Sequence, residues 1–376
     1  MALGHATLIS AHARRRVLLL LRIPIIEINR CSPQVRLPTL TSHLSRWSET
    51  HECGTECHGD KESPQDKNMT ALIEAVHRDA RAEAELHLTP LAARIGAEVH
   101  GMELSGSLAG AAVAALKKAL LKYRVLFFRA QHHLDDTEHE AFGRLWGELE
   151  SHPTIAAPSG TTFLELDSRH GGRADSWHTD VTFRRTPPKL GILPVVKLPP
   201  VGGDTVWANT VAPFYGLPQE LRTLAERLWA VHGNDYDYAA TRNVEADDTG
   251  RKRYREAFVS TVFEAEHPVV RLHPETGERS LLLGHFVKRL VGYSGNDSRR
   301  LFEILQGHVV RLENTVRWRW QHGDVAVWDN RATQHHAIND YGDHHRVVRR
   351  VTVSGDAPLS VDGRRSVDRS AQVQSG

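Results

Sequence analysis

The sequence predicts a mainly β protein, a sandwich or barrel with helices packed on its outside. The first observation behind this prediction is a series of short β-like runs after residue 260, each bounded by turn residues: 267–274, 279–284, 315–320, 324–330 and 346–355. Strands of this length at such intervals are typical of sandwiches and barrels. The second observation is that segments with helical spacing and good helix formers precede these runs, and helices of this kind can cover the outside of a sheet.

The elements before residue 260 are predicted from local signals. Gly96 and Gly101 interrupt the first apolar segments, and Asp135 or Asp136 can cap a helix. In chain order we expect a strand, turn and strand over residues 88–104, a helix over 108–123, a strand over 125–128, a helix from 135 or 136 to about 147, and a helix over 218–229.

The chain is expected to hold one globular domain, over residues 69–355, between two loose ends. Through Arg46 the chain has seven arginines and one acidic residue, Glu27. This composition is typical of an organelle-targeting peptide, or of an upstream stretch that is not normally translated. Because globular patterning starts at Met69, we expect residues 1–68 to be a disordered extension without chemistry, and the polar residues 356–376 to be a flexible tail.

The composition argues against two classes of partner. A formal net charge of +1 gives no reason to expect nucleic acid as a partner. The longest apolar run, residues 17–26, is interrupted by Arg22 and Pro24. It is too short to span a bilayer, so no membrane partner is expected either.

The three cysteines indicate a reducing compartment. Cys31, Cys53 and Cys57 all precede residue 60, so no disulfide framework holds the main domain together. We therefore expect a cytoplasmic protein. Cys53 and Cys57, flanked by His51 and His58, have the look of a zinc knuckle, but a second ligand pair at a regular spacing is missing.

The stretch SWHTDVTF, residues 176–183, places His178 two residues before Asp180. On a strand or at its edge, residues i and i+2 point to the same side, so both side chains can converge on one point. An imidazole and a carboxylate suit a first-row transition metal, but two ligands do not make a site. A solvated loop pair is the alternative in a chain with 24 histidines. The apolar run after Asp180 is expected to anchor the pair in a sheet.

A third ligand for such a site is available far along the chain. His335 and His336 follow a β-like run, and an iron site with two histidines and one carboxylate needs a second histidine. Farther on, Arg346, Arg349 and Arg350 lie in another strand-like run. A guanidinium is well shaped to hold a carboxylate by two parallel hydrogen bonds, although surface arginines on an edge strand are the commoner case.

Between these motifs lies the stretch PPVGGDTVWANT, residues 199–210. Gly202 and Gly203 permit a tight turn, after which a strand is expected to begin at Asp204 and Thr205. The Thr205 hydroxyl can hydrogen-bond the same carboxylate as the arginines. A threonine after a turn is more often structural, so this residue alone decides nothing.

Taken together, WHTDVTF, GGDTVWANT, WDNRATQH and the arginines beyond resemble the taurine/2,4-dichlorophenoxyacetate dioxygenase family, over roughly residues 86–355. Members of that family are Fe(II)- and 2-oxoglutarate-dependent enzymes built on a double-stranded β-helix, or jelly roll. The resemblance therefore implies this fold, Fe(II) as the metal, and 2-oxoglutarate and O₂ as co-substrates. It implies that iron is bound by His178, Asp180 and His335, 2-oxoglutarate by Thr205 and Arg346, and substrate by His152, Arg350 and Phe286, whereas His336 is structural.

Two positions depart from the taurine-specific members of that family. Ile155 stands where they have a tyrosine, and Ala174 stands where they have an asparagine. Both changes replace polar groups with apolar ones, and an alkyl chain against Ile155 would gain burial worth about 0.8 kcal/mol per CH₂. The stretches HPETGERSLLLGHFVKRLVG and WANT resemble the alkylsulfatase branch. The implied reaction is oxidation of an alkyl sulfate ester to release sulfate and an aldehyde, with succinate and CO₂.

Three alternatives remain open. The first is a sulfonate (taurine-like) dioxygenase, the second a non-catalytic β-sandwich binding protein, and the third a metal-dependent hydrolase that releases sulfate without oxidation. Dependence on 2-oxoglutarate and O₂ separates the oxygenase from the hydrolase. As partners we expect a small organosulfur substrate and further copies of the chain in a homo-oligomer, a dimer or tetramer.

Overall fold

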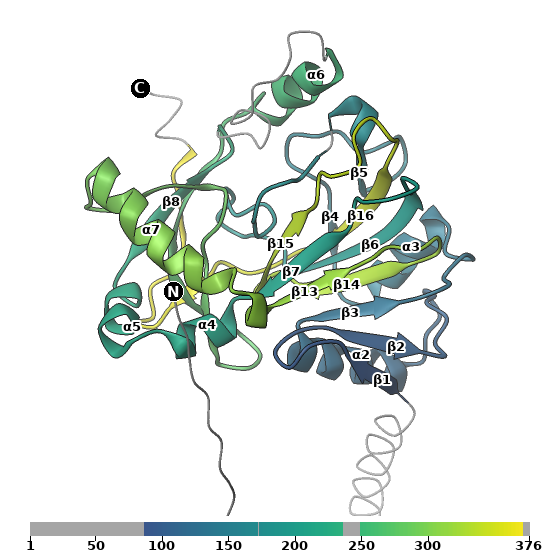
Figure 1. Cartoon of the computed structure of the whole chain (residues 1–376), viewed down its shortest axis with the longest axis horizontal. Coiled ribbons are helices and arrows are strands. Elements are labelled where there is room, and N and C mark those ends of the chain that lie inside the picture. Colours follow the sequence, from purple (N-terminus) through teal and green to yellow (C-terminus); the bar gives the residue numbers. More distant parts are fainter. Residues whose placement is uncertain (1–85, 172, 236–248, 371–376) are drawn as a thin grey trace, which may run out of the picture. The chain divides into compact units, whose positions relative to one another are not determined.

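The computed structural model describes residues 86–171, 173–235 and 249–370 (Figure 1). The chain divides into two units, residues 1–62 and 63–376, and all described residues belong to the second unit. The extension predicted at residues 1–68, with its three cysteines, therefore lies outside the described residues. Among the described helices, none is both long enough and apolar enough to cross a membrane.

An eight-stranded sheet forms the centre of the second unit. Its order is β1 (His87–Pro90), β2 (Ala97–His100), β3 (Val125–Phe128), β14 (Val325–Asp329), β6 (Leu190–Lys197), β16 (Val347–Val353) and β4 (Leu149–Glu150), with β5 (Leu164–Asp167) also paired to β16. Strands β2 and β3 run parallel, and the other neighbours run antiparallel. Most neighbours are distant in sequence, as in a jelly roll.

A second sheet packs on one face of the central sheet. It consists of β13 (Thr315–Trp318), β7 (Thr205–Asn209) and β15 (Thr333–Ala337), in that order. Successive residues of a strand point to opposite faces, and Val125 and Phe127 of β3 share the core between the two sheets with Trp207 and Trp318. The rings of Phe127 and Trp318 stack with centroids 4.2 Å apart. These two layers confirm the prediction of a mainly β jelly roll.

Helices cover the opposite face of the central sheet. Leu126 and Phe128, the alternate residues of β3, share a core with α2 (Gly110–Tyr123) and α3 (Asp136–Arg144). The predicted cap of α3 is present, because the Asp135 side chain accepts a 2.9 Å hydrogen bond from the backbone N–H of Glu138. The flanking helices that the sequence predicts are therefore confirmed on this face.

A third core packs several further helices and strands against β7. In Figure 1, α4, α5 and α7 gather on one side of the sheets. One further sheet has the order β12 (Val287–Leu290), β8 (Trp229–Gly233), β9 (Glu264–Pro268) and β18 (Val367–Asp368); another has β11 (Arg279–Leu281), β10 (Val270–Leu272) and β17 (Leu359–Ser360). The helices are α4 (Val211–Gly216), α5 (Gln219–Ala225), α6 (Thr249–Phe258) and α7 (Gly295–Val309), with short 3₁₀ turns η1 (Ser168–His170) and η2 (Leu312–Asn314).

Three predicted segments differ from the structure. The helix expected over 218–229 ends at Ala225, and Trp229 begins the fully buried strand β8. The run 267–274 is divided between β9 and β10. Strands β17 and β18 pair with β10 and β9, within a stretch for which a flexible tail was expected. In each case neighbouring strands form hydrogen bonds with the backbone of a short segment. The local sequence pattern gives no sign of this pairing.

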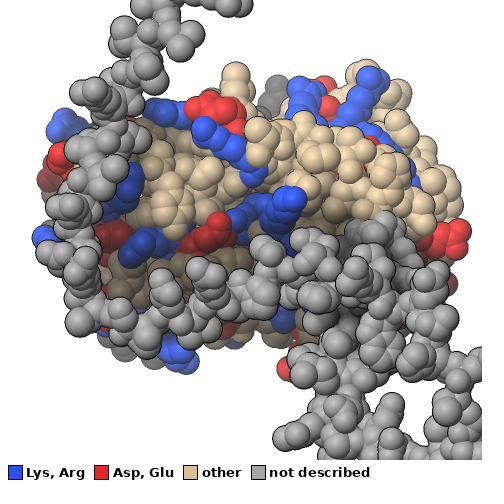
Figure 2. Space-filling model, turned by 90° about the horizontal axis from the view of Figure 1, so that it is seen from below, with Lys and Arg blue, Asp and Glu red and all other residues tan. Residues whose placement is uncertain are grey.

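Charges of both signs are mixed on the described surface. On the face in Figure 2, basic and acidic side chains of the described residues alternate around areas without charge. A nucleic-acid-binding surface gathers Lys and Arg into a patch or stripe. This face offers no such stripe among its described residues, in keeping with the net charge of +1.

Candidate metal centre

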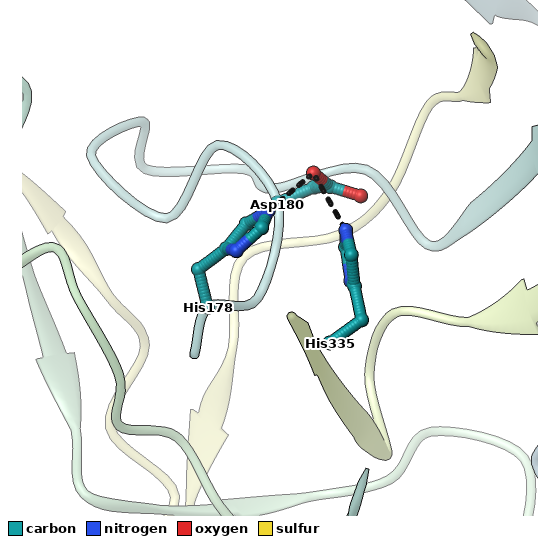
Figure 3. A group of neighbouring side chains, drawn as sticks. All are labelled: His178, Asp180 and His335. Carbon is teal, nitrogen blue, oxygen red and sulfur yellow. Dashed lines mark ion pairs between the residues drawn. The ribbon is translucent and has the colours of Figure 1, made fainter. Parts of the chain in front are cut away.

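His178, Asp180 and His335 form a buried cluster in which one ligand atom from each residue lies within 4.8 Å of the others (Figure 3). His335 belongs to β15, and His178 pairs with it through two backbone hydrogen bonds of 2.8 and 3.0 Å. This pairing brings the two imidazole centroids to 4.1 Å, although 157 positions separate them in the sequence. The three side chains that the sequence singled out are thus together.

The segment that carries Asp180 is a turn, not a strand. His178 forms only an isolated bridge, and residues 180–183 are turn residues. Val181 has a φ of 55°, which a β-branched residue rarely adopts. The expectation that the apolar run anchors the pair in a sheet is therefore wrong. Val181 and Phe183 hold the turn by burial, with 8% and 0% of their surface exposed.

The donor atoms of the cluster suit a divalent cation. Nδ1 of His178 donates to the backbone carbonyl of Ser176 at 2.7 Å, which directs Nε2 toward Oδ1 of Asp180, 3.6 Å away. Nε2 of His335 lies 3.8 Å from the same oxygen. Oδ2 of Asp180 and Nδ1 of His335 are buried without a hydrogen-bond partner among the described residues. Buried polar atoms without partners are rare and suit a site built for a ligand.

The protonation states also suit a metal. Burial, together with the neighbouring His178, lowers the pKa of His335 well below its ordinary value. Burial alone would raise the pKa of Asp180, but the Arg350 guanidinium and His335 outweigh it and hold this pKa far below its ordinary value. Near neutral pH the site therefore presents a neutral imidazole and an ionised carboxylate, the forms that bind metals.

His336 lies outside this cluster. Its ring packs against Trp177, with centroids 5.5 Å apart, whereas the alternation of β15 directs the preceding His335 toward Asp180. The choice between two adjacent histidines, which the sequence left to the family register, thus has a geometric basis.

Two buried arginines border the cluster. Arg350 forms an ion pair with Oδ1 of Asp180 through Nη1, while its Nε is buried and has no hydrogen-bond partner among the described residues. Arg346 donates from Nε to the Gly203 carbonyl at 3.0 Å and from Nη2 to Oγ1 of Thr205 at 3.4 Å. Both side chains are about 95% buried.

Arg346 forms no ion pair with any described carboxylate. Burial lowers its pKa from the ordinary arginine value, yet a guanidinium stays charged in proteins. A buried charge without a partner is costly. An anion beside the guanidinium would complete this site. Thr205 already lies next to Arg346, and its hydroxyl also accepts a 3.0 Å hydrogen bond from Nε1 of Trp320.

His152 lies close enough to Arg350 and Asp180 for both charges to influence its titration. Burial, reinforced by Arg350, lowers the pKa of His152 to about 3. Its Nδ1 accepts a 3.1 Å hydrogen bond from the backbone N–H of Ile155, so the neutral ring carries its proton on Nε2. His152 is therefore an uncharged donor.

An apolar cluster adjoins the metal-binding residues. Phe286 is buried and its ring meets His178 edge-on at 6.3 Å. Ile155 packs against the same cluster. The sequence analysis missed two further members, Phe183 and Phe258, which meet edge-on at 5.8 Å. The aromatic residue in the run after Asp180 was the available sequence signal for Phe183. Phe258 lies at the end of α6, 78 positions after Asp180, so spacing gives no signal for it.

Two histidines and one carboxylate on a β scaffold define the class of non-heme Fe(II) oxygenase sites. The comparisons with known proteins assign the chain more closely. It belongs to the taurine catabolism dioxygenase TauD, TfdA family, whose model matches residues 87–352.

Two similar proteins share more than half of their residues with the matched part of the chain. An alpha-ketoglutarate-dependent sulfate ester dioxygenase from Pseudomonas putida is 56% identical over 75% of this chain and 94% of its own length. An alkylsulfatase from Acinetobacter baylyi is 54% identical over 74% of this chain and 88% of its own. A solved taurine dioxygenase from Burkholderia xenovorans is 38% identical, with a TM-score of 0.63 over 75% of this chain and 94% of its own.

Proposed function

We propose that this chain is an Fe(II)- and 2-oxoglutarate-dependent dioxygenase that oxidises an alkyl sulfate ester and releases sulfate and an aldehyde. The observation that carries the proposal is the buried His178–Asp180–His335 cluster with two buried arginines beside it. The names of the relatives above 50% identity support the sulfate ester as substrate. A yeast alpha-ketoglutarate-dependent sulfonate dioxygenase is only 27% identical over 73% of this chain.

The three clustered side chains would hold Fe(II). Protein ligands on one side of a metal leave other positions for co-substrates, which is how such sites admit O₂ and a keto acid. When bound, iron with 2-oxoglutarate and O₂ supplies an oxidant, and the co-substrate is converted to succinate and CO₂. The protein's own contribution is to orient the substrate carbon and to exclude water from the oxidant.

Arg346 and Thr205 would bind the distal carboxylate of 2-oxoglutarate. The buried guanidinium supplies a fixed positive charge, and the Thr205 hydroxyl beside it supplies a further hydrogen-bonding group. Two directed contacts of this kind fix the orientation as well as the affinity of a carboxylate.

Arg350 and His152 would bind the sulfate group. Arg350 has a further buried donor atom, Nε, besides the Nη1 that contacts Asp180. The neutral His152 adds an Nε2–H donor without adding charge. An anion held next to the metal-binding residues places the carbon attached to the ester oxygen within reach of the oxidant. Oxidation there gives a product that breaks the C–O bond and yields the aldehyde and sulfate.

The alkyl chain would lie against the apolar cluster. Ile155, Phe183, Phe258 and Phe286 offer apolar side chains beside His152 and His178. None of these four can pair with an ammonium group by a charge or a hydrogen bond. This composition supports an alkyl sulfate over taurine.

The proposal is tested by supplying the purified protein with Fe(II), 2-oxoglutarate, O₂ and a panel of alkyl sulfates, alkyl sulfonates and taurine. We expect alkyl sulfates to stimulate succinate formation, with sulfate and aldehyde released in equal amounts. His335→Ala should abolish this turnover, and the matched variant His336→Ala should retain most of it.

Each alternative has its own outcome in this experiment. Sulfate release without 2-oxoglutarate would identify a hydrolase. Sulfonates turned over at higher kcat/KM than sulfates would identify a sulfonate dioxygenase. Binding of alkyl sulfates without any succinate would identify a binding protein.

A homo-oligomer, dimer or tetramer, and a cytoplasmic location are also parts of the proposal. Exposed apolar side chains such as Val201 and Leu312, 66% and 87% exposed, offer surface for contacts between copies. Light scattering of the purified protein measures the mass. The restriction of all cysteines to the first 60 residues supports a reducing compartment.

A further inference from the structure

The turn that carries Asp180 holds a backbone conformation that it would not keep by itself. Val181 lies in the left-handed region, with a φ of 55°. For a β-branched residue this region costs free energy, and it persists only where the surroundings enforce it. The position of the Asp180 carboxylate therefore depends on contacts that fix this turn.

Asn330 supplies such contacts with its whole side-chain amide. Its Oδ1 accepts from the backbone N–H of Asp180 at 2.9 Å. Its Nδ2 donates to the carbonyl of Asp180 at 3.2 Å and to the carbonyl of Pro188 at 2.8 Å. Asn330 and Asp180 are each 2% exposed. One buried side chain thus ties both ends of the loop 180–188.

The same residue connects the turn to the strand that carries His335. Asn330 lies between β14 and β15, and its backbone N–H donates to the carbonyl of Lys189 at 3.0 Å. Three residues on, the carbonyl of Thr333 accepts from the hydroxyl of Thr179 at 2.8 Å. A short path of buried hydrogen bonds therefore fixes the position of Asp180 relative to His335.

We propose that Asn330 is a positioning residue that sets the Asp180 carboxylate against His335 for metal binding. The hydrogen bonds of Asn330 go to the backbone of Asp180, Pro188 and Lys189, so it acts through the backbone of the loop that carries the Asp180 carboxylate. The inference rests on the metal site of the proposed function. It goes beyond that function by assigning the geometry of the site to a residue outside the cluster.

The test compares Asn330→Ala with Asn314→Ala. Asn314 is also 2% exposed, and its side chain makes partly buried hydrogen bonds, accepting from Arg94 at 2.7 Å and donating to the His308 carbonyl at 2.9 Å. Both variants should lose stability to a similar extent. Only Asn330→Ala should also lose metal affinity, by about 10- to 100-fold, the range for groups that orient ligands. Titration of the metal-free folded protein with Co(II), followed by absorption, measures that affinity.

A second variant keeps the test decisive if Asn330→Ala does not fold. Asn330→Asp retains the acceptor for the Asp180 N–H and loses both donors, so its metal affinity should fall in the same direction. Wild-type affinity in a folded Asn330 variant, or an equal loss in Asn314→Ala, would overturn the inference. Because Co(II) binding does not depend on any substrate, failure to oxidise sulfate esters would overturn the proposed function alone.

Discussion

At the scale of single residues, three arginines in β16 and directly before it show how far spacing predicts the role of a side chain. Even spacing predicts that Arg346 and Arg350 share one face and that Arg349 points away. In the structure Arg346 and Arg350 are buried, whereas Arg349 pairs with Asp136 and Glu165 at 2.7 and 2.8 Å. Spacing could not predict that Arg350 would pair with Asp180, because that contact depends on a turn 170 positions earlier.

Single substitutions can distinguish the roles of the two buried arginines. Arg346→Ala should weaken 2-oxoglutarate binding even without substrate, because the co-substrate loses its charged partner. Arg350→Ala should mainly weaken alkyl sulfate binding. Loss of a buried charge-assisted contact costs about 2–5 kcal/mol, or about thirtyfold to several thousandfold in affinity. Apparent constants for both compounds, measured for both variants, test this division.

Arg349→Ala is the matched control for these variants. It also removes an arginine from this segment, but it breaks partly exposed ion pairs, worth about 0–1 kcal/mol, and a cation–π contact with Phe163. Both constants should therefore stay as in the wild type. If Arg350→Ala leaves the affinity for alkyl sulfates unchanged, the anion site has been placed wrongly.

At the scale of elements, helices and strands with strong local sequence signals were predicted well. Elements that depend on tertiary contacts were not. Strand β3 matches the predicted residues 125–128, and α2 ends at Tyr123 as expected. Strand β6, at the centre of the main sheet, was not predicted, although it pairs with both β14 and β16. It contains Pro194 and begins beside Gly191, residues that weaken a strand pattern. Its neighbours in the sheet, not its own sequence, decide its state.

Gly191 in β6 packs so closely against Trp328 that a larger residue cannot be accommodated there. A Cβ at this position would lie 2.3 Å from the indole of Trp328, which in turn lies 5.0 Å from the His335 ring. Gly191→Ala should therefore destabilise the protein by about 1–3 kcal/mol, as overpacked cores do. Urea unfolding measures the loss.

Gly307→Ala provides the comparison. Gly307 is exposed in α7, and a Cβ there would meet nothing within 4 Å. Alanine in a helix interior is more stable than glycine by about 0.5–1 kcal/mol, so this variant should gain stability. No loss in Gly191→Ala would show that the packing around Trp328 is looser than the structure indicates. A loss in Gly307→Ala would instead contradict the expected gain from replacing an exposed helix glycine.

At the scale of the whole molecule, buried histidines make the stability of the fold depend on pH. His139, on α3, is 1% exposed and donates from Nε2 to the Ile192 carbonyl at 3.1 Å, while its Nδ1 is buried without a partner among the described residues. His267 is fully buried between Thr182 and Ser366. Burial lowers the pKa of both histidines to about 4. Composition revealed 24 histidines, but only the packing shows which of them must stay neutral.

The metal-free protein should consequently lose stability in mild acid. Below its ordinary pKa of 6.5, His139 gains a proton in the unfolded chain but not in the folded one until about pH 4. The unfolded state thus binds more protons, and the free energy of unfolding falls as pH falls through this window. At pH 5 the loss from His139 amounts to on the order of 2 kcal/mol. Gln at position 139 can keep the bond to Ile192 but cannot titrate. His139→Gln should therefore lose about 2 kcal/mol less than the wild type between pH 7 and pH 5 in urea unfolding, and equal losses would contradict this assignment.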